Sequence, residues 1–350
     1  MGRGYVAVGS MSAMPRVAAI FPGQGSQSVG MGSDVAARSP QARNIFARAT
    51  RVLGYDLLAL QTQGPDEKLR ETQYSQPAIF TTNLALYYAA AEGLQPVVSA
   101  GHSFGEFCSL VIAGSLDFED ALRVVDERGK AMQAAAELSA GAMAAVLGLD
   151  ARVVRTIAER VMEQTGRRVQ LANFNSPSQI VVSGDAGAVR AASDAMLAGG
   201  AKRVVPLNVS GAWHSELMQP AIERFAAAVQ RAQFSMPSFD VISNVDAQPY
   251  RDVDGIRQNL VHSIVHEVRW HDAAERLLSY ELDVVVEFGA SGVLVPLMKR
   301  MPNAPQVFVV SDYAGIEKLR ERSSSTAALR TSAQPFDSAR FARTAEDSAK

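Results

Sequence analysis

Short apolar runs alternate along this chain with stretches whose apolar positions recur at helical spacing. Continuous apolar runs bounded by turn residues are typical of buried strands, and apolar residues three and four positions apart are typical of packed helices. Strands are predicted at about 16–21, 96–100, 143–147, 168–173, 179–183, 203–207, 241–243, 284–288 and 306–310. Helices are predicted over most of 34–62 and 64–94, from 117 onward, and at about 150–165, 186–199, 219–232, 254–264, 271–279 and 293–300. This alternation predicts an α/β fold.

Residues 141–208 follow a pattern of their own. The predicted order of elements is βαββαβ, with a turn at Asn175-Ser176-Pro177 between the second and third strands. This order is the ferredoxin-like arrangement. We therefore expect a small domain at 141–208, inserted into a larger domain formed by 16–140 and 209–320.

Two local signals predict where helices begin. Asp117 precedes a helical pattern with acidic residues in its first turn, which is typical of an N-cap. Pro77 is expected in the first turn of another helix, where its missing N–H would have no helical partner.

The two ends of the chain lack apolar periodicity. Residues 1–15 are rich in Gly, Ser and Met without an apolar signal core, so we expect a disordered extension. Residues 321–350 are rich in Ser, Ala and Arg, and we expect a disordered tail. No apolar run approaches the roughly 18 residues that a membrane span needs.

Composition and charge exclude several classes of protein. The chain has 350 residues and a formal net charge of −2 at pH 7, which does not favour nucleic acid or an anionic membrane as the main partner. Cys108 is the single cysteine, so an internal disulfide framework is excluded and a reducing, cytoplasmic location is expected. We expect Cys108 to lie in the core.

The candidate nucleophile lies between an apolar run and a helical one. Gly101-His102-Ser103-Phe104-Gly105 has the Gly-x-Ser-x-Gly spacing, directly after the strand predicted at 96–100. In a strand–turn–helix context this spacing exposes a serine hydroxyl on a tight turn. The alternative is a glycine-flanked turn with a capping serine, and the flanking strand and helix favour the nucleophile.

Five histidines are available as the base that a serine nucleophile requires. His102 adjoins Ser103, and neighbours on a tight turn usually point apart. His262, His266 and His271 form a sequence cluster, but the last two are one residue too far apart for the HExxH zinc helix, so a metal site is not favoured. His214, in a Gly-x-x-His-Ser loop after a predicted strand, is the best candidate. No acid stands out as a third member, and a backbone carbonyl could orient the imidazole instead.

Two further features point to ligand binding. Arg128 lies on an apolar helix face between Val124 and Met132, so it is either paired in the interior or extends its head to water; the pattern alone leaves both open. The glycine-rich loop at 22–27 leaves the first strand, where α/β folds place functional loops.

The chain resembles the malonyl-CoA:acyl carrier protein transacylases, which include polyketide acyltransferase domains. The motifs that carry the resemblance are Phe21-Pro22-Gly23-Gln24-Gly25-Ser26-Gln27, Gln76-Pro77-Ala78, Gly101-His102-Ser103-Phe104-Gly105-Glu106, Arg128-Gly129-Lys130-Ala131-Met132, Gly211-Ala212-Trp213-His214-Ser215, Asn244-Val245-Asp246-Ala247 and Glu287-Phe288-Gly289. They extend over about 16–315 and imply an α/β-hydrolase-like large domain with a ferredoxin-like small one.

The resemblance also implies roles for single residues. Ser103 would carry the malonyl group as an ester, and His214 would be the base and then the acid. Backbone N–H groups of Gln24 and Phe104 would form the oxyanion hole, and Arg128 would bind the malonyl carboxylate. Three further expectations follow: Gln76 and Asn175 line the pocket, a carbonyl near Arg269 orients the histidine, and the bulky Phe104 and Trp213 restrict the acyl group to a small one.

The partners implied are a coenzyme A thioester and an acyl carrier protein that carries its own phosphopantetheine, with no cofactor or metal held by this chain. A monomer is expected, in either fatty acid or polyketide synthesis. We expect an acidic carrier protein to bind near basic side chains at Arg190, Lys202, Arg203, Lys299 and Arg300. The alternative is an acyl hydrolase or thioesterase acting on carrier-bound acyl groups, which the carboxylate-binding Arg128 disfavours. A catalytically silent carrier-binding module is a third reading, and the intact Ser, His and Arg set disfavours it.

Overall fold

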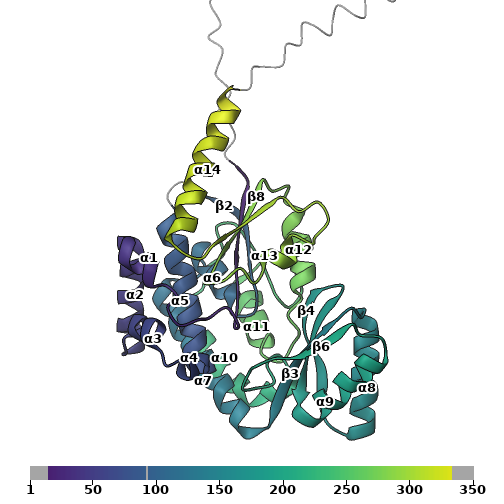
Figure 1. Ribbon diagram of the computed structural model, residues 1–350. Helices are drawn as coiled ribbons and strands as arrows, with labels where there is room; N and C mark the ends of the chain where they lie inside the picture. Colours follow the sequence, from purple (N-terminus) through teal and green to yellow (C-terminus); the bar gives the residue numbers. More distant parts are fainter. Residues whose placement is uncertain (1–14, 92–93, 333–350) are drawn as a thin grey trace, which may run out of the picture.

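A five-stranded parallel sheet forms the centre of the large domain (Figure 1). The computed structural model describes residues 15–91 and 94–332. The strands of this five-stranded sheet follow the order β7-β2-β1-β8-β9. Their bounds are Val17–Phe21 for β1, Pro96–Gly101 for β2, Asp240–Ile242 for β7, Val284–Phe288 for β8 and Gln306–Val310 for β9. Every residue of β1 is buried, as expected of a central strand with helices on both faces. The predicted α/β class is confirmed.

The first half of the chain supplies a group of helices on one side of this sheet (Figure 1). Their bounds are Ser33–Arg38 for α1, Pro40–Leu53 for α2, Leu57–Gln63 for α3, Asp66–Arg70 for α4, Thr72–Ala90 for α5, Gly105–Ile112 for α6 and Phe118–Leu138 for α7. Asp117 caps α7 by accepting a hydrogen bond from the Asp120 N–H, as predicted. The prediction for Pro77 was wrong, because α5 begins at Thr72 and encloses the proline. Thr72, Ser75 and Gln76, which precede the proline in this helix, are buried. The stabilisation from their packing outweighs the loss of the helical hydrogen bond that proline cannot donate.

The small domain is a four-stranded antiparallel sheet with two helices. Its elements are Gly141–Leu147 for β3, Ala151–Thr165 for α8, Val169–Ser176 for β4, Gln179–Asp185 for β5, Ala186–Ala198 for α9 and Arg203–Pro206 for β6. The strand order β4-β5-β3-β6 is ferredoxin-like, which confirms the predicted topology. The turn predicted from Asn175 is shorter than expected, because β4 continues through Ser176 by pairing with β5. All four strands fall within 141–208; the boundaries of the domains themselves stay a prediction.

The chain returns to the large domain after β6. Besides β7, β8 and β9, this part of the chain forms the 3-10 helix η1 at Glu216–Ala221, followed by α10 at Ile222–Arg231, α11 at Val253–His262, α12 at Trp270–Leu278, α13 at Val295–Met298 and α14 at Tyr313–Ser332. The helix α14 continues past 320, so the expectation of disorder was wrong for 321–332. Residues 333–350, and the extension predicted at 1–15 apart from residue 15, lie outside the described residues. Within the described part of the chain, no helix is both long and apolar enough to cross a membrane.

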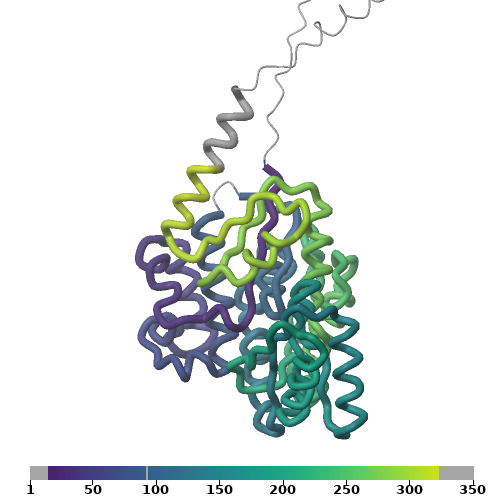
Figure 2. Tube along the Cα trace, turned by 45° about the vertical axis from the view of Figure 1, so that its right-hand side comes forward, coloured from purple at the N-terminus to yellow at the C-terminus, as the bar shows by residue number. Residues whose placement is uncertain are grey.

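The small domain contacts the large one through the edge strand β4. The Val268 N–H donates to the Ala172 carbonyl at 2.8 Å, and the Phe174 N–H donates to the Val268 carbonyl at 2.9 Å. An ion pair between Arg155 and Glu267 at 3.0 Å joins the two domains beside this contact. The start of β1 and the helix α14 lie at the opposite end of the molecule from the small domain (Figures 1 and 2).

Candidate active site

The turn between β2 and α6 holds Ser103 in a conformation that few non-glycine residues adopt. Its φ is 53°, in the left-handed region. A Cβ on Gly101 would lie 2.0 Å from the Gly105 carbonyl carbon, and one on Gly105 would lie 2.4 Å from the Phe21 carbonyl oxygen. Both glycines are therefore required because backbone segments meet at these points, and the predicted nucleophile turn is present.

His214 is the histidine that the fold brings to Ser103. Its Nε2 lies 2.9 Å from Ser103 Oγ, and its Nδ1 lies 2.7 Å from the Ser263 carbonyl oxygen. A neutral imidazole that donates from Nδ1 to this carbonyl presents an accepting Nε2 to the serine hydroxyl. The expectation of a carbonyl near Arg269 was wrong. Ser263 is the C-cap residue of α11, where carbonyls lack intrahelical partners, whereas the Arg269 carbonyl accepts from the Ala273 N–H at 3.0 Å.

The electrostatic surroundings keep His214 neutral. Burial and, second to it, the positive charge of Arg128 together lower the pKa of His214 to about 3, although the hydrogen bond to Ser263 opposes them. A neutral imidazole is the form that accepts a proton, so His214 is ready to act as a base at neutral pH.

Arg128 lies in the interior and does not extend to water. Its side chain is 1% exposed. Nη1 donates to Gln76 Oε1 at 2.9 Å and Nη2 donates to Ser103 Oγ at 3.2 Å, while Nε has no partner among the described residues. Burial is the main cause that lowers the pKa of Arg128 to about 9, and the charge of Glu106 opposes this shift. No ion pair within the described residues involves this guanidinium, so the buried cation faces Ser103 without a carboxylate in direct contact, and the charge of Glu106 acts on it from farther away.

A cavity of about 80 Å³ lies over these groups. It is lined by Gln24, Gln76, His102, Ser103, Arg128, Met132, Met143, Asn173, Leu207, Val209, Trp213 and His214. Six of the predicted site residues are among them. The other two predicted site residues, Phe104 and Asn175, do not line the cavity. The Phe104 ring lies 6.0 Å from the Arg128 guanidinium, and Asn175 Oδ1 lies 2.9 Å from His102 Nε2.

The sequence predictions missed Asn173 as a lining residue. It lies two positions before Asn175 on β4, and side chains two apart on a strand share a face. A bulge near this point shifts the pairing of β4 with β5, so only the structure shows which asparagine reaches the cavity.

The loop at 22–27 packs against the serine turn. The His102 N–H donates to the Phe21 carbonyl at 2.9 Å, and a Cβ on Gly23 would lie 2.7 Å from the His102 carbonyl oxygen. The backbone N–H groups of Gln24 and Phe104 make no hydrogen bond within the described residues. Both are therefore available to an oxyanion at this site.

The other histidines do not form a metal centre. The rings of His262 and His266 lie 5.5 Å apart, while His271 is buried against Phe174 and contacts Glu275. Across the described ranges, no three side chains of metal-binding type gather in one place.

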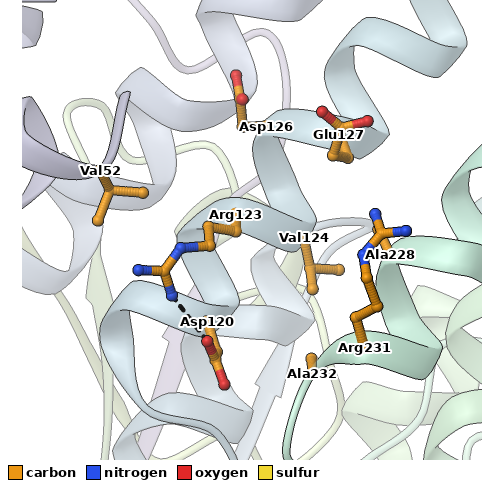
Figure 3. A pocket seen from close by; sticks show the side chains of 9 residues that line it. All are labelled: Val52, Asp120, Arg123, Val124, Asp126, Glu127, Ala228, Arg231 and Ala232. Atoms are coloured by element: carbon orange, nitrogen blue, oxygen red, sulfur yellow. Dashed lines mark hydrogen bonds and ion pairs between the residues drawn. The ribbon is translucent and has the colours of Figure 1, made fainter. Parts of the chain in front are cut away.

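A second cavity of about 360 Å³ lies between α2, α7 and α10 (Figure 3). Charged side chains of both signs line it, and Arg123 pairs with Asp120 at 2.8 Å. It holds neither the serine nor the histidine, so the chemistry belongs to the smaller cavity.

The chain is similar to known proteins over most of its length. The acyl transferase domain family matches residues 19–313. The malonyl CoA-acyl carrier protein transacylase of Escherichia coli K12 is 42% identical over 290 residues, which are 82% of this chain and 93% of that protein. The solved structure of the transacylase of this name from Coxiella burnetii has a TM-score of 0.85 at 36% identity, covering 88% of this chain and 98% of the other. A malonyl-transacylase solved with its acyl carrier protein from a type II polyketide synthase has a TM-score of 0.84 at 39% identity, covering 88% and 99%. The chain therefore belongs to the acyl transferase family, in the group that contains the malonyl-CoA:acyl carrier protein transacylases.

Proposed function

We propose that this protein transfers a malonyl group from malonyl-CoA to the phosphopantetheine thiol of an acyl carrier protein, through an ester on Ser103. The observation that carries the proposal is Arg128, a buried cation 3.2 Å from Ser103 Oγ with no carboxylate partner among the described residues. A dicarboxylic acyl group would supply that partner as it is presented to the nucleophile. The names of the relatives point to the same reaction.

The first half-reaction acylates Ser103. His214 Nε2 takes the hydroxyl proton as Oγ attacks the thioester carbonyl, and the N–H groups of Gln24 and Phe104 stabilise the oxyanion. When the tetrahedral intermediate collapses, the carbon–sulfur bond breaks and His214 returns the proton to the coenzyme A thiolate. The carbonyl of Ser263 keeps the imidazole oriented through both proton transfers.

The second half-reaction regenerates the enzyme. His214 takes a proton from the phosphopantetheine thiol, whose sulfur attacks the Ser103 ester. The ester bond to Oγ breaks, and the same proton passes to Ser103. No redox step or metal is needed, and the phosphopantetheine belongs to the partner, so we propose that the chain itself requires no cofactor.

Substrate choice is assigned to the residues around the cavity. Arg128 would bind the malonyl carboxylate through two parallel charge-assisted hydrogen bonds, which a planar guanidinium supports. Gln76 holds one side of the guanidinium through the contact at 2.9 Å. Trp213 with Met132 and Met143 occupies the surrounding wall, so a small acyl group fits the space of about 80 Å³.

We further propose a cytoplasmic monomer. The single cysteine, Cys108, is free and buried, which is consistent with a reducing compartment. One relative is the malonyl-transacylase of a type II polyketide synthase carrier protein, and the name of the Escherichia coli relative specifies no pathway, so either fatty acid or polyketide synthesis is compatible with the proposal.

Mass spectrometry of the intact protein tests the proposal. Malonyl-CoA should add one malonyl group to the wild type, with much less addition from methylmalonyl- or acetyl-CoA, and none should be found on Ser103→Ala. Addition of a carrier protein bearing phosphopantetheine should move the group to the carrier. Loss of the ester to water at the same rate with and without carrier would instead show a hydrolase.

The choice of base is tested in the same assay. His214→Ala should slow acylation by roughly 10²- to 10⁴-fold, the usual contribution of a general base. A severe His102→Ala variant together with a mild His214→Ala variant would reverse the assignment.

A further inference from the structure

Ser103 is held in its left-handed conformation by a side chain from another part of the chain. Asn244 Oδ1 accepts a hydrogen bond from the Ser103 N–H at 3.1 Å, and Asn244 Nδ2 donates to the Ser103 carbonyl at 3.3 Å. One amide thus hydrogen-bonds to both backbone polar groups of the residue whose φ is 53°, and the Ser103 carbonyl also accepts from the Glu106 N–H at 3.2 Å. Asn244 follows the end of β7, and β7 lies next to β2 in the sheet, so the two strand ends bring the residues together.

The orientation of this amide is itself determined. Asn244 is 2% exposed, and its Nδ2 also donates to Glu106 Oε2. The Asn244 backbone N–H donates to the same oxygen at 3.3 Å, while the Asn244 carbonyl accepts from the Arg269 N–H at 2.9 Å. A reversed amide would set its oxygen against the Glu106 carboxylate and its NH₂ against the Ser103 N–H. Only the observed orientation pairs every group.

Glu106 is in turn fixed from its other side. Its Oε1 accepts a hydrogen bond from the Tyr250 hydroxyl, and it lies in the first turn of α6, three residues after Ser103. Glu106, Asn244 and Tyr250 are all buried. The network therefore links the helix that follows the nucleophile to the loop after β7, and it contains no atom of the cavity wall.

We propose that Asn244 is a positioning residue for the nucleophile, held in orientation by Glu106 and Tyr250. Ser103 Oγ lies 2.9 Å from His214 Nε2 and 3.2 Å from Arg128 Nη2, and a rotation of the Ser103 backbone would change both distances. A displacement near 1 Å at a reacting atom can cost about 10²-fold in rate. This inference rests on the proposed role of Ser103 and assigns a residue that the reaction scheme does not otherwise use.

The test measures the reactivity of Ser103 with a probe that does not need Arg128. The rate of labelling by an uncharged fluorophosphonate is followed by intact mass spectrometry, beside single-turnover acylation by malonyl-CoA. Asn244→Ala should label about 10²-fold more slowly. Its maximal acylation rate should fall by a similar factor, while the malonyl-CoA concentration for half-maximal rate stays unchanged, because the residues lining the cavity are intact.

Two variants serve as controls. Asn259→Ala removes a second asparagine that holds the same loop, through Ser243 Oγ at 3.0 Å and Asp246 at 3.2 Å, but does not contact Ser103, and it should label at the wild-type rate. Glu106→Gln keeps an acceptor for Asn244 and a donor for Tyr250, and should recover most of the rate that Glu106→Ala loses.

Asn244→Asp covers the case in which Asn244→Ala does not fold. It has the same size and keeps an acceptor for the Ser103 N–H, but it can donate only when protonated, beside the Glu106 carboxyl. Its labelling rate relative to wild type at the same pH should rise as the pH is lowered from 9 to 6.

The outcomes separate this inference from the proposed function. Wild-type labelling at Ser103 together with equal labelling rates for wild type, Asn244→Ala and Asn244→Asp at every pH would overturn the positioning role alone. A wild type that neither probe modifies at Ser103 would overturn both proposals.

Discussion

At the scale of single residues, the most informative side chain is Arg128. A buried guanidinium is costly unless a charged or polar partner satisfies it, and here the partners are one amide oxygen and one hydroxyl. The same charge lowers the pKa of His214, so the residue that would bind the substrate also helps to keep the base neutral. Binding of a carboxylate would offset the charge of Arg128 at the moment when His214 must accept a proton.

Arg128→Ala should separate malonyl from acetyl transfer. Truncating one partner of a buried charge pair costs on the order of 2–5 kcal/mol, so malonyl acylation should fall by roughly 30- to 10³-fold or more. Acetyl acylation should fall much less, because an acetyl group has no carboxylate to bind. The measurement is the acylation rate of Ser103 with each coenzyme A thioester.

Two further variants complete this comparison. Arg128→Lys should restore only part of the malonyl rate, since an ammonium lacks the planar pair of donors. Arg123→Ala changes an exposed arginine on the same helix and should leave both rates unchanged. Equal losses for malonyl and acetyl in Arg128→Ala would make Arg128 a structural residue.

At the scale of elements, the site depends on how closely β2, α6 and β1 approach one another. The contacts that a Cβ on Gly101 or Gly105 would meet are backbone atoms, which cannot move independently of the strand or helix. The helix α11 contributes through its end, because the carbonyl of its C-cap residue Ser263 accepts from His214. Ser103 and His214 are thus oriented by the ends of elements.

Gly101→Ala should destabilise the fold. An added Cβ would lie 2.0 Å from the Gly105 carbonyl carbon, and overpacking against backbone should lower the free energy of unfolding by about 3 kcal/mol or more. Gly187→Ala, in the first turn of α9, meets only side-chain atoms, Asp185 Oδ1 at 3.1 Å and Arg167 Nη1 at 3.5 Å, and should change this free energy by no more than about 1 kcal/mol. Urea denaturation of the three proteins measures the difference. Wild-type stability of Gly101→Ala would contradict the geometry of the turn.

At the scale of the whole molecule, the two domains meet beside the segment that orients His214. The segment at 263–269 carries the carbonyl that orients His214, and Val268 in that segment pairs with the edge of β4. The small domain therefore supports the segment that aligns the base, besides supplying Asn173 and Met143 to the cavity. The basic residues predicted to bind a carrier protein are all exposed: Arg190, Lys202, Arg203, Lys299 and Arg300. Their role stays a prediction.

Transfer to an acidic carrier protein should be more sensitive to salt than acylation by malonyl-CoA. Long-range attraction by an exposed patch is screened as ionic strength rises, whereas the buried Arg128 contact is screened much less. Arg203→Glu should slow transfer to the carrier by roughly 10-fold at low salt and leave acylation unchanged.

The matched control for Arg203→Glu is Arg51→Glu. Arg51 is exposed on α2, which lies on the other side of the molecule from the small domain (Figure 1). This substitution should alter neither half-reaction. Equal salt sensitivity of the two half-reactions, with Arg203→Glu behaving like Arg51→Glu, would place the carrier elsewhere.

The sequence by itself determined the parts of this protein that depend on neighbouring residues. The strand–turn–helix around Ser103, the cap at Asp117 and the βαββαβ order of the small domain follow from local periodicity and turn chemistry, which act within a few positions. Arg128 on an apolar stripe and His214 in its loop could be singled out in the same way.

Tertiary structure alone decided which distant groups meet. Ser263 orients His214, Asn173 lines the cavity, Asn244 holds Ser103, and Pro77 lies inside a buried helix. Each outcome depends on how strand ends and helix ends are juxtaposed by the packing of a core built from the whole chain. No pattern along the sequence encodes such a contact, because the free energy that selects it comes from burial shared by distant segments; Ser103 and Asn244, for example, are 141 residues apart.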